Sequence, residues 1–350
     1  MYELMMLRSE LTSLMIRTHH YLRKQPTLKA EEVPLLYREP GVLTGYRLPG
    51  MKLVSYVISV LQLNNEVVNI WTHLIGFVVV VFKIHFLLGE FGADDSRIFP
   101  VIGFGVCCLL YTFFSVIAHT VHSISPLVHY TAFQVDYAGI ALYAFGGSLS
   151  VFYTSTDSET KTQLQSWFLP VNFILSWFCF LCCCIAKLKY RRPYPISRKL
   201  WQVIPYGVHT LLTIGLVFRR AVKCFSDNCN DPGLSMHRTA VILAITAALT
   251  FSSHLPEKVW PGQFDLIGQG HQVFHVVSIL LTLKQFDAAR WDILHSNIDF
   301  SNDIRPKLST VLGMIACLSV CCVFTILALR PYVRKVVQDG GISGETNRVN

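Results

Sequence analysis

The sequence predicts an all-α protein: a polytopic bundle of transmembrane helices with a seven-span core, an eighth span and a cytoplasmic N-terminus. Composition is the first observation behind this prediction. Of the 350 residues, 52% are hydrophobic and only 15% are charged, whereas roughly a quarter of an average soluble domain is charged. The second observation is that apolar residues gather in runs close to the roughly 20 residues that cross a bilayer. Such spans are helical because lipid offers no partner to an open backbone group.

Eight apolar stretches follow one another along the chain, and short polar joints separate them. Turn-forming residues mark those joints, among them Gly92, Pro126, Asp157 and Pro232. A helix rises about 1.5 Å per residue, so each stretch is long enough to cross the hydrocarbon core. The expected spans are residues 67–89, 98–119, 130–153, 166–186, 200–218, 238–254, 270–288 and 308–329.

These spans define three parts: a cytoplasmic N-terminal segment at residues 1–52, a transmembrane domain at 53–329 and a C-terminal tail at 330–350. No signal-peptide pattern precedes the first span, so that span is expected to direct insertion itself. Residues 1–24 mix apolar and charged side chains as an interfacial amphipathic helix does. A partly disordered tail is the equal alternative for this stretch.

Lysine and arginine are distributed unequally between the two sides of the predicted membrane domain. Nineteen of the 30 fall on the side of the N-terminus, and six of these lie in the joint at residues 187–199. Short cytoplasmic segments retain basic residues, so the N-terminus is expected in the cytoplasm. Arg219, Arg220 and Lys223 run against this trend. The net charge of +8 is explained by this asymmetry and by anionic inner-leaflet lipid, so nucleic acid is not an expected partner.

Cysteine is plentiful, with 11 residues, but most fall inside spans, where a thiol acts as a small apolar side chain. Cys224 and Cys229 lie in the fifth joint, which this topology places outside, where an oxidising environment could join them in a local disulfide. The adjacent Cys182, Cys183 and Cys184 lie near a basic joint and could instead be palmitoylated. The spacing alone decides neither possibility.

Ionisable side chains inside or at the ends of spans are costly in lipid and indicate functional sites. Ser115 and His119 close the second span on one helix face, and Asp136 lies in the first turns of the third. His271 and His275 open the seventh span, again four residues apart. In a serpentine of helices these three span ends lie on one side of the membrane. Three imidazoles and a carboxylate are therefore expected at one level.

Three neutral imidazoles with an open fourth position are the ligand set of a zinc site that keeps a water molecule. His119, His271 and His275 are therefore candidate zinc ligands. Asp136 is a candidate to orient that water or accept its proton, and Ser115 to hydrogen-bond the same water or a ligand. The alternative is that each is an isolated polar side chain that pairs with a backbone carbonyl or with water at a helix end.

A second polar cluster lies where the first span begins. Glu66, Asn69 and His73 are separated by offsets of three and seven, which place them on one helix face. They begin on the same cytoplasmic side as the candidate metal ligands. The functional interpretation is a polar network that supports the metal site, and the alternative is a hydrogen-bonded helix entry.

These polar motifs, in this order and spacing, resemble those of the progestin and adiponectin receptor family. The motifs are Asn65-Glu66-x-x-Asn69-x-Trp71-Thr72-His73, Ser115-x-x-x-His119, Asp136 and Gly270-His271-x-x-x-His275. The likeness covers about residues 31–300 and is supported by Thr44-Gly45-Tyr46-Arg47, Arg191-Arg192-Pro193-Tyr194-Pro195 and Leu255-Pro256-Glu257-Lys258. The supporting stretches look most like the membrane progestin receptor branch.

The resemblance implies a helical bundle with a cytoplasmic N-terminus and a zinc ion on His119, His271 and His275. It places Asp136 and Ser115 beside the water bound to zinc. It also implies a receptor for progestational steroids in the plasma membrane, with rapid non-genomic signalling through inhibitory G proteins. A steroid or other lipid ligand and membrane lipids are the expected partners.

An enzyme is the alternative function: a zinc-dependent intramembrane hydrolase of lipid amides such as ceramide. Asp136 would then be the general base, and Ser115 would help to hold the oxyanion. The same five side chains serve both functions, so the sequence leaves the choice open. A transporter or channel is less favoured, because no pair of interrupted spans repeats between the two halves.

Overall fold

The computed structural model describes residues 26–192, 194–295 and 306–346. The expected alternatives at residues 1–24 therefore lie outside the described residues. The described chain is mostly helical, and its one bridge between extended segments pairs Leu28 with Tyr46. The prediction of an all-α polytopic bundle is confirmed.

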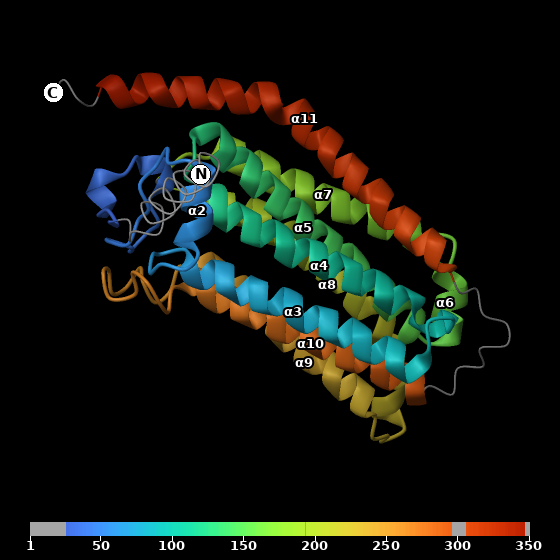
Figure 1. Cartoon of the computed structure of the whole chain (residues 1–350). Helices are drawn as coiled ribbons and strands as arrows, with labels where there is room; N and C mark the ends of the chain where they lie inside the picture. The colour runs from blue at the N-terminus through green and yellow to red at the C-terminus, as the bar shows by residue number, and fades with distance from the viewer. Residues whose placement is uncertain (1–25, 193, 296–305, 347–350) are drawn as a thin grey trace, which may run out of the picture.

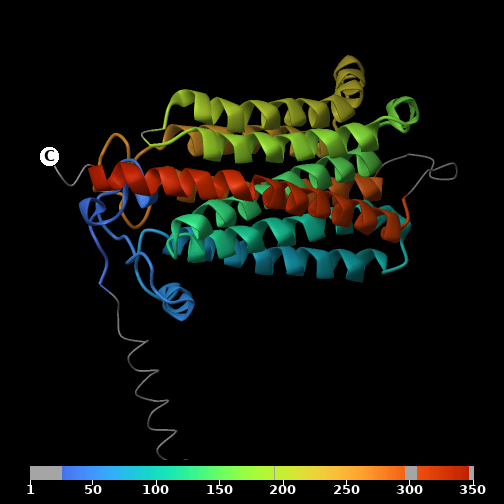
Figure 2. The same cartoon turned by 90° about the horizontal axis from the view of Figure 1, so that it is seen from above.

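Eight long helices form the bundle, and they run side by side along its length (Figure 1). They are α3 (Val67–Phe91), α4 (Phe99–Val121), α5 (Pro126–Thr154), α7 (Phe168–Lys189), α8 (Ile196–Ser226), α9 (Pro232–Ser253), α10 (Gly270–His295) and α11 (Leu308–Thr346). The short elements are α2 (Leu53–Ser59), α6 (Ser158–Leu164) and the 3-10 turns η1 (Ala30–Glu32), η2 (Leu35–Tyr37) and η3 (Ser96–Ile98). Because the number of long helices is even, the described N-terminal segment and the end of α11 lie at the same end (Figure 2).

Seven of the long helices in the described part of the chain are long and apolar enough to cross a membrane. The eighth long helix, α10, lies among them in the bundle but is more polar. It buries Gln272, His275, Ser278, Thr282 and Asp292 against its neighbours. These five polar side chains are therefore turned toward the protein interior, which is where polar side chains in a membrane domain belong. Other polar side chains of α10 are exposed, among them Lys284 and Arg290.

Local signals explain where several helices begin. Ser125 accepts a hydrogen bond from the backbone N–H of Val128, and Pro126 is the first residue of α5. Asp231 accepts from the N–H of Leu234 at the start of α9 in the same way. Each cap satisfies an N–H group that the helix leaves unpaired, so these helices begin earlier than their apolar stretches do.

Two helices are much longer than their apolar stretches. Helix α8 covers Ile196–Ser226, although the expected span was 200–218, because its polar ends continue as helix beyond the apolar stretch. Helix α11 continues past Pro331 as far as Thr346, through most of the expected C-terminal tail, and changes direction part-way along (Figure 1). A proline inside a helix removes one backbone hydrogen bond and is a common cause of a bend.

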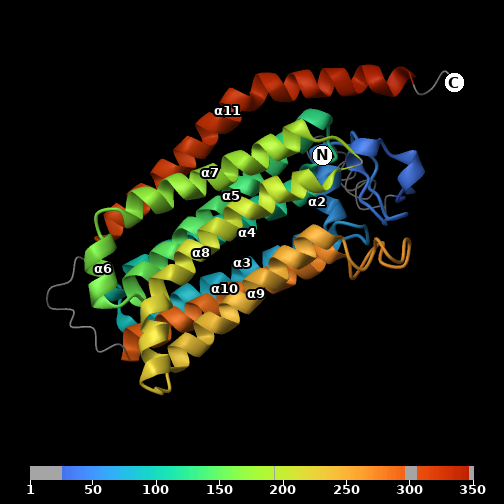
Figure 3. The same cartoon turned by 180° about the vertical axis from the view of Figure 1, so that it is seen from behind.

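Two apolar clusters form the core. One joins α4, α5, α7, α8 and α11 around Leu142, Phe145 and Phe180, and the other joins α3, α4 and α10 around Phe104 and Phe286. Helix α4 is therefore central. Figure 3 shows α8 between α7 and the pair formed by α9 and α10. Cys182, Cys183 and Cys184 are at most 3% exposed, so the structure gives no support for their palmitoylation.

At one end of the bundle, the connection between α8 and α9 is stabilised by a disulfide and by a group of ion pairs. Cys224 and Cys229 are joined by a disulfide, which the sequence left open. Arg220 of α8 lies 2.8 Å from Oδ1 of Asp292 in α10, and Nε2 of His237 in α9 lies 2.9 Å from its Oδ2. The side chain of Asp292 is completely buried, so this carboxylate joins three helices.

The N-terminal segment docks against the loop before α10 at the opposite end. The backbone N–H of Leu43 and the hydroxyl of Thr44 donate to the carboxylate of Asp265, at 2.8 and 2.6 Å. Gly41 has a φ of +78°, and a Cβ there would lie 2.1 Å from the carbonyl oxygen of Glu257. Only glycine permits this close approach.

Candidate metal centre

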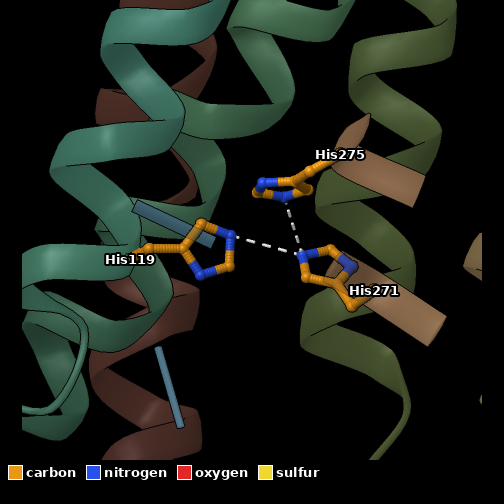
Figure 4. A group of neighbouring side chains, drawn as sticks. All are labelled: His119, His271 and His275. Atoms are coloured by element: carbon orange, nitrogen blue, oxygen red, sulfur yellow. Dashed lines mark hydrogen bonds between the residues drawn. The ribbon is translucent and has the colours of Figure 1, made fainter. Parts of the chain in front are cut away.

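Three histidine side chains meet near the docked N-terminal segment, and they come from two helices far apart in sequence. His119 lies in the last turn of α4, and His271 and His275 lie in the first turns of α10. Figure 4 shows the three rings turned toward one another. Nε2 of His271 is 3.3 Å from Nε2 of His119 and 3.2 Å from Nε2 of His275. This group could hold a metal ion, since one ligand atom from each ring lies within 4.8 Å of the others.

Hydrogen bonds on the far side of two rings decide which nitrogen is free. Nδ1 of His119 lies 2.7 Å from Oε2 of Glu66, and Nδ1 of His275 lies 3.1 Å from the backbone carbonyl oxygen of Asn69. Both partners accept, so in neutral imidazoles both Nε2 atoms present a lone pair. A neutral His271 has a single N–H group, so it can donate to at most one of the Nε2 atoms of His119 and His275. At least one lone pair is left without a partner, and a cation shared by all three nitrogens removes this conflict.

Glu66 lies at the N-terminal end of α3 and connects the histidines to their surroundings. Its Oε2 also accepts from the amide of Asn69 at 2.9 Å, and its Oε1 lies 3.2 Å from Nε2 of His122. Arg47 donates to the backbone carbonyl oxygen of His119 at 2.6 Å and so satisfies the C-terminal end of α4. The end of α4 that carries the histidine is therefore held on two sides.

His73 packs directly on His275. The two rings are stacked with centroids 3.8 Å apart and planes 10° from parallel. Nε2 of His73 lies 3.3 Å from the hydroxyl of Tyr111, which in turn lies 3.0 Å from the hydroxyl of Ser278. All three members of the second polar cluster thus contact the histidine group or its direct partners.

Ser115 and Asp136 line a small cavity together with the three histidines. Asp136 is 7% exposed and Ser115 is 1% exposed. The Ser115 hydroxyl lies near the Asp136 carboxylate but makes no hydrogen bond of standard geometry. The cavity volume is about 100 Å³, which is room for a few water molecules at roughly 30 Å³ each. The five candidate side chains therefore surround one small polar space.

The start of α10 is fixed by a close backbone approach. A Cβ at Gly270 would lie 2.5 Å from the carbonyl oxygen of Leu255. The N–H of Gly270 donates to Oε2 of the buried Glu257 at 2.7 Å, which places a carboxylate at the helix N-terminus. The approach to Leu255 and the hydrogen bond to Glu257 therefore fix the backbone directly before His271.

Several side chains that line the cavity were not singled out in the sequence. They are Tyr111 and four basic residues, Lys187, Arg192, Arg198 and Lys199. In the sequence these basic residues were used for membrane orientation, and Arg192 also for the family resemblance, but none was assigned to the site. Their approach to the histidines depends on how α7 and α8 pack, which no local pattern reveals.

A family model described as haemolysin-III related matches residues 61–286. The chain belongs to the haemolysin-III-related family. The matched region contains all three histidines together with Glu66, Ser115 and Asp136. The membership that the sequence motifs predicted, in the progestin and adiponectin receptor family, is confirmed.

Relatives in the haemolysin-III-related family carry receptor names. The chain is 36% identical over 275 residues to the human protein named membrane progestin receptor beta, which covers 77% of each chain. It is 31% identical over 323 residues to membrane progestin receptor alpha of Cynoscion nebulosus, which covers 90% of each. The zebrafish (Danio rerio) protein named membrane progestin receptor alpha-B is 32% identical over 318 residues.

Proposed function

We propose that this protein is a membrane receptor for progestin-like steroids that signals rapidly from the plasma membrane. Its similarity to proteins named membrane progestin receptors, over 77–90% of its length, carries the proposal. Coupling to a heterotrimeric G protein is the signalling route that the family resemblance suggests. The seven apolar helices support residence in a membrane.

A separate cavity has a size that suits a steroid. It lies between α5, α8, α9 and α10 and has a volume of about 700 Å³, whereas ligand pockets commonly measure about 300–1,000 Å³. Ile214, Val217 and Leu281 are among the apolar residues that line it, and Tyr143 and His209 provide polar groups. An apolar wall with a few polar groups is the usual design of a site for an apolar ligand.

Binding of labelled progesterone to the purified protein tests the receptor proposal. Ile214→Trp fills the cavity and is expected to weaken binding at least about tenfold, because the side chain occupies ligand space. Val208→Trp is the matched control, since Val208 lies on the same helix, is 50% exposed and does not line the cavity. Absence of saturable progesterone binding by the wild type would contradict the proposal.

We further propose that the metal held by His119, His271 and His275 is zinc. The donor set supports this assignment, because three imidazole nitrogens and one free position are typical of zinc sites. In a receptor the ion would brace α4 against α10. In an enzyme it would supply an activated water molecule and polarise a carbonyl group.

The membrane orientation that we propose places the N-terminus in the cytoplasm. Two observations at opposite ends of the bundle support it. The basic residues around the α7–α8 joint lie at the end that carries the N-terminal segment, and the Cys224–Cys229 disulfide lies at the other end. Disulfides persist in oxidising compartments, and basic segments remain in the cytoplasm.

A zinc-dependent lipid-amide hydrolase, of the ceramidase type, is the second candidate function. The location of Ser115 and Asp136 in the histidine cavity favours it. Asp136 would accept the proton of the attacking water, and the unpartnered Ser115 hydroxyl would donate to the carbonyl oxygen of the amide. Fatty-acid release from ceramide by zinc-loaded protein, lost in Asp136→Asn with zinc content unchanged, is the expected result. No release by the wild type would contradict this function and leave the receptor proposal untouched.

A further inference from the structure

Four basic side chains line the cavity that also contains the three histidines. Lys187 lies near the end of α7, Arg192 in the following connection, and Arg198 and Lys199 in the first turns of α8. We call this group the basic cradle.

The basic cradle is buried. Lys187, Arg198 and Lys199 are 5%, 7% and 9% exposed, and the side chain of Arg192 is 8% exposed. Lysine and arginine are rarely buried to this degree unless an anion is present. Four such residues around a single cavity therefore need an explanation.

Among the described residues, only Arg192 of the basic cradle forms an ion pair, with Glu39 at 2.5 Å. Lys199 donates to the backbone carbonyl oxygen of Phe251, and Lys187 contacts a ring nitrogen of His129. The guanidinium of Arg198 lies over the ring of Tyr194, 3.7 Å from its centroid. Three buried basic side chains thus lack a carboxylate partner. The buried Nε atoms of Arg192 and Arg198 also lack a hydrogen-bond partner.

Two of the other carboxylates that line the cavity are engaged elsewhere. Glu66 accepts from His119, and Glu257 accepts from the backbone N–H of Gly270. Asp136 lines the cavity too, but within the described structure it forms no ion pair with a member of the basic cradle. Arg198 and Lys199 are moreover at the N-terminal end of α8, where the helix dipole adds positive potential instead of offsetting their charge. Among the described residues, three of the four basic side chains of the cradle are therefore left without an ion-pair partner.

We propose that the basic cradle binds a phosphomonoester group, either the headgroup of a lipid or a soluble phosphate. A phosphomonoester carries about −1.5 to −2 charges at pH 7, which suits three unpaired basic side chains better than the single charge of a carboxylate. Its oxygens suit the fork of donors that a guanidinium presents. The cavity of about 100 Å³ admits a group of that size but not a whole lipid, whose chains would stay between the helices.

The test measures binding of dioctanoyl phosphatidate to the purified full-length protein in detergent, beside inorganic phosphate, dioctanoylglycerol and octanoate. Arg198→Gln/Lys199→Gln removes two cations of the cradle and is expected to weaken phosphatidate binding at least about tenfold. Arg219→Gln/Lys223→Gln is the matched control. It removes the same charges from the opposite end of α8 and is expected to leave binding unchanged.

The four probes answer two questions: whether the basic cradle binds a phosphomonoester, and whether that group belongs to a lipid or to a soluble phosphate. Phosphatidate binding that inorganic phosphate does not displace supports a lipid headgroup, and tight binding of inorganic phosphate alone supports a soluble source. Binding of dioctanoylglycerol or octanoate as tight as that of phosphatidate would overturn the phosphomonoester assignment. So would failure of both phosphate probes to bind the wild type, a result that does not depend on how any variant folds.

Discussion

The carboxylate of Glu66 and Nδ1 of His119 lie 2.7 Å apart, although 53 positions separate the two residues in sequence. Glu66→Gln is expected to lower metal affinity about 10- to 100-fold, as the loss of a partner behind a ligand histidine typically does. The amide keeps the size of the side chain, but it binds the Nδ1 proton less strongly than a carboxylate does. Metal content after dialysis against graded chelator checks this.

Glu90→Gln is the matched control for that experiment. Glu90, near the end of α3, pairs with Arg290 near the end of α10, whereas the histidines lie in the first turns of α10 and the last turn of α4. Its substitution is expected to leave metal content unchanged. Equal loss of metal in both variants would mean that Glu66 stabilises the fold in general and does not orient His119.

Asp292→Ala is expected to destabilise the protein by about 3 kcal/mol, because it leaves Arg220 and His237 without their buried partner. Unfolding in mixed detergent micelles measures the change. Asp287→Ala is the control. Asp287 and its partner Lys83 are each 34% exposed, so a loss below about 1 kcal/mol is expected there. Similar losses in the two variants would contradict the role of Asp292.

Docking of the N-terminal segment is expected to depend on pH through Glu39. Burial raises the pKa of this carboxyl, but the charge of Arg192 outweighs that effect and holds the pKa below its usual 4.5. The ion pair therefore contributes stability above about pH 4.5, and the contribution is lost as pH falls through the lowered pKa. Thermal stability of the wild type should fall over this range more steeply than that of Glu39→Gln. The exposed Glu31→Gln serves as control and should follow the wild type.

Cys224 and Cys229 provide a test of membrane orientation. In intact cells, a membrane-impermeant maleimide should label this pair only after treatment with an impermeant reductant, because the disulfide is expected to face the outside. Cys224→Ser/Cys229→Ser should abolish the label, since the described free cysteines lie within the long helices. Labelling that requires permeabilised cells would place this joint in the cytoplasm and the N-terminus outside, the reverse of the proposed orientation.

The sequence predicted the bundle because bilayer thickness imposes a repeat length on apolar stretches, which is a strong and local constraint. It also indicated that His119, His271 and His275 meet, since a serpentine of helices leaves little freedom about which ends face the same side. The prediction that Glu66, Asn69 and His73 share one helix face likewise used only their spacing along the chain. These inferences use chain direction and helix periodicity alone.

What the sequence missed depends on which helices are neighbours. Lys187 and Arg198 look like ordinary cytoplasmic basic residues until α7 and α8 pack beside the histidine cavity. His122, which has no partner at helical spacing, lies 3.2 Å from Glu66 through a tertiary contact. The extent of α8 was underestimated because its polar ends belong to the helix but not to the apolar stretch.

Helix α10 makes polar contacts with neighbouring helices near both of its ends. Its first turns hold His271 and His275 against α4, and its last turns hold Asp292 against α8 and α9. These points are about 30 Å apart along the axis, nearly the thickness of a bilayer. A helix is stiff along its length, so α10 acts as a rigid rod between the two ends of the bundle. If α10 tilts at one end of the bundle, its other end moves with it as part of the same rigid helix. No series of side-chain rearrangements between the two ends is needed.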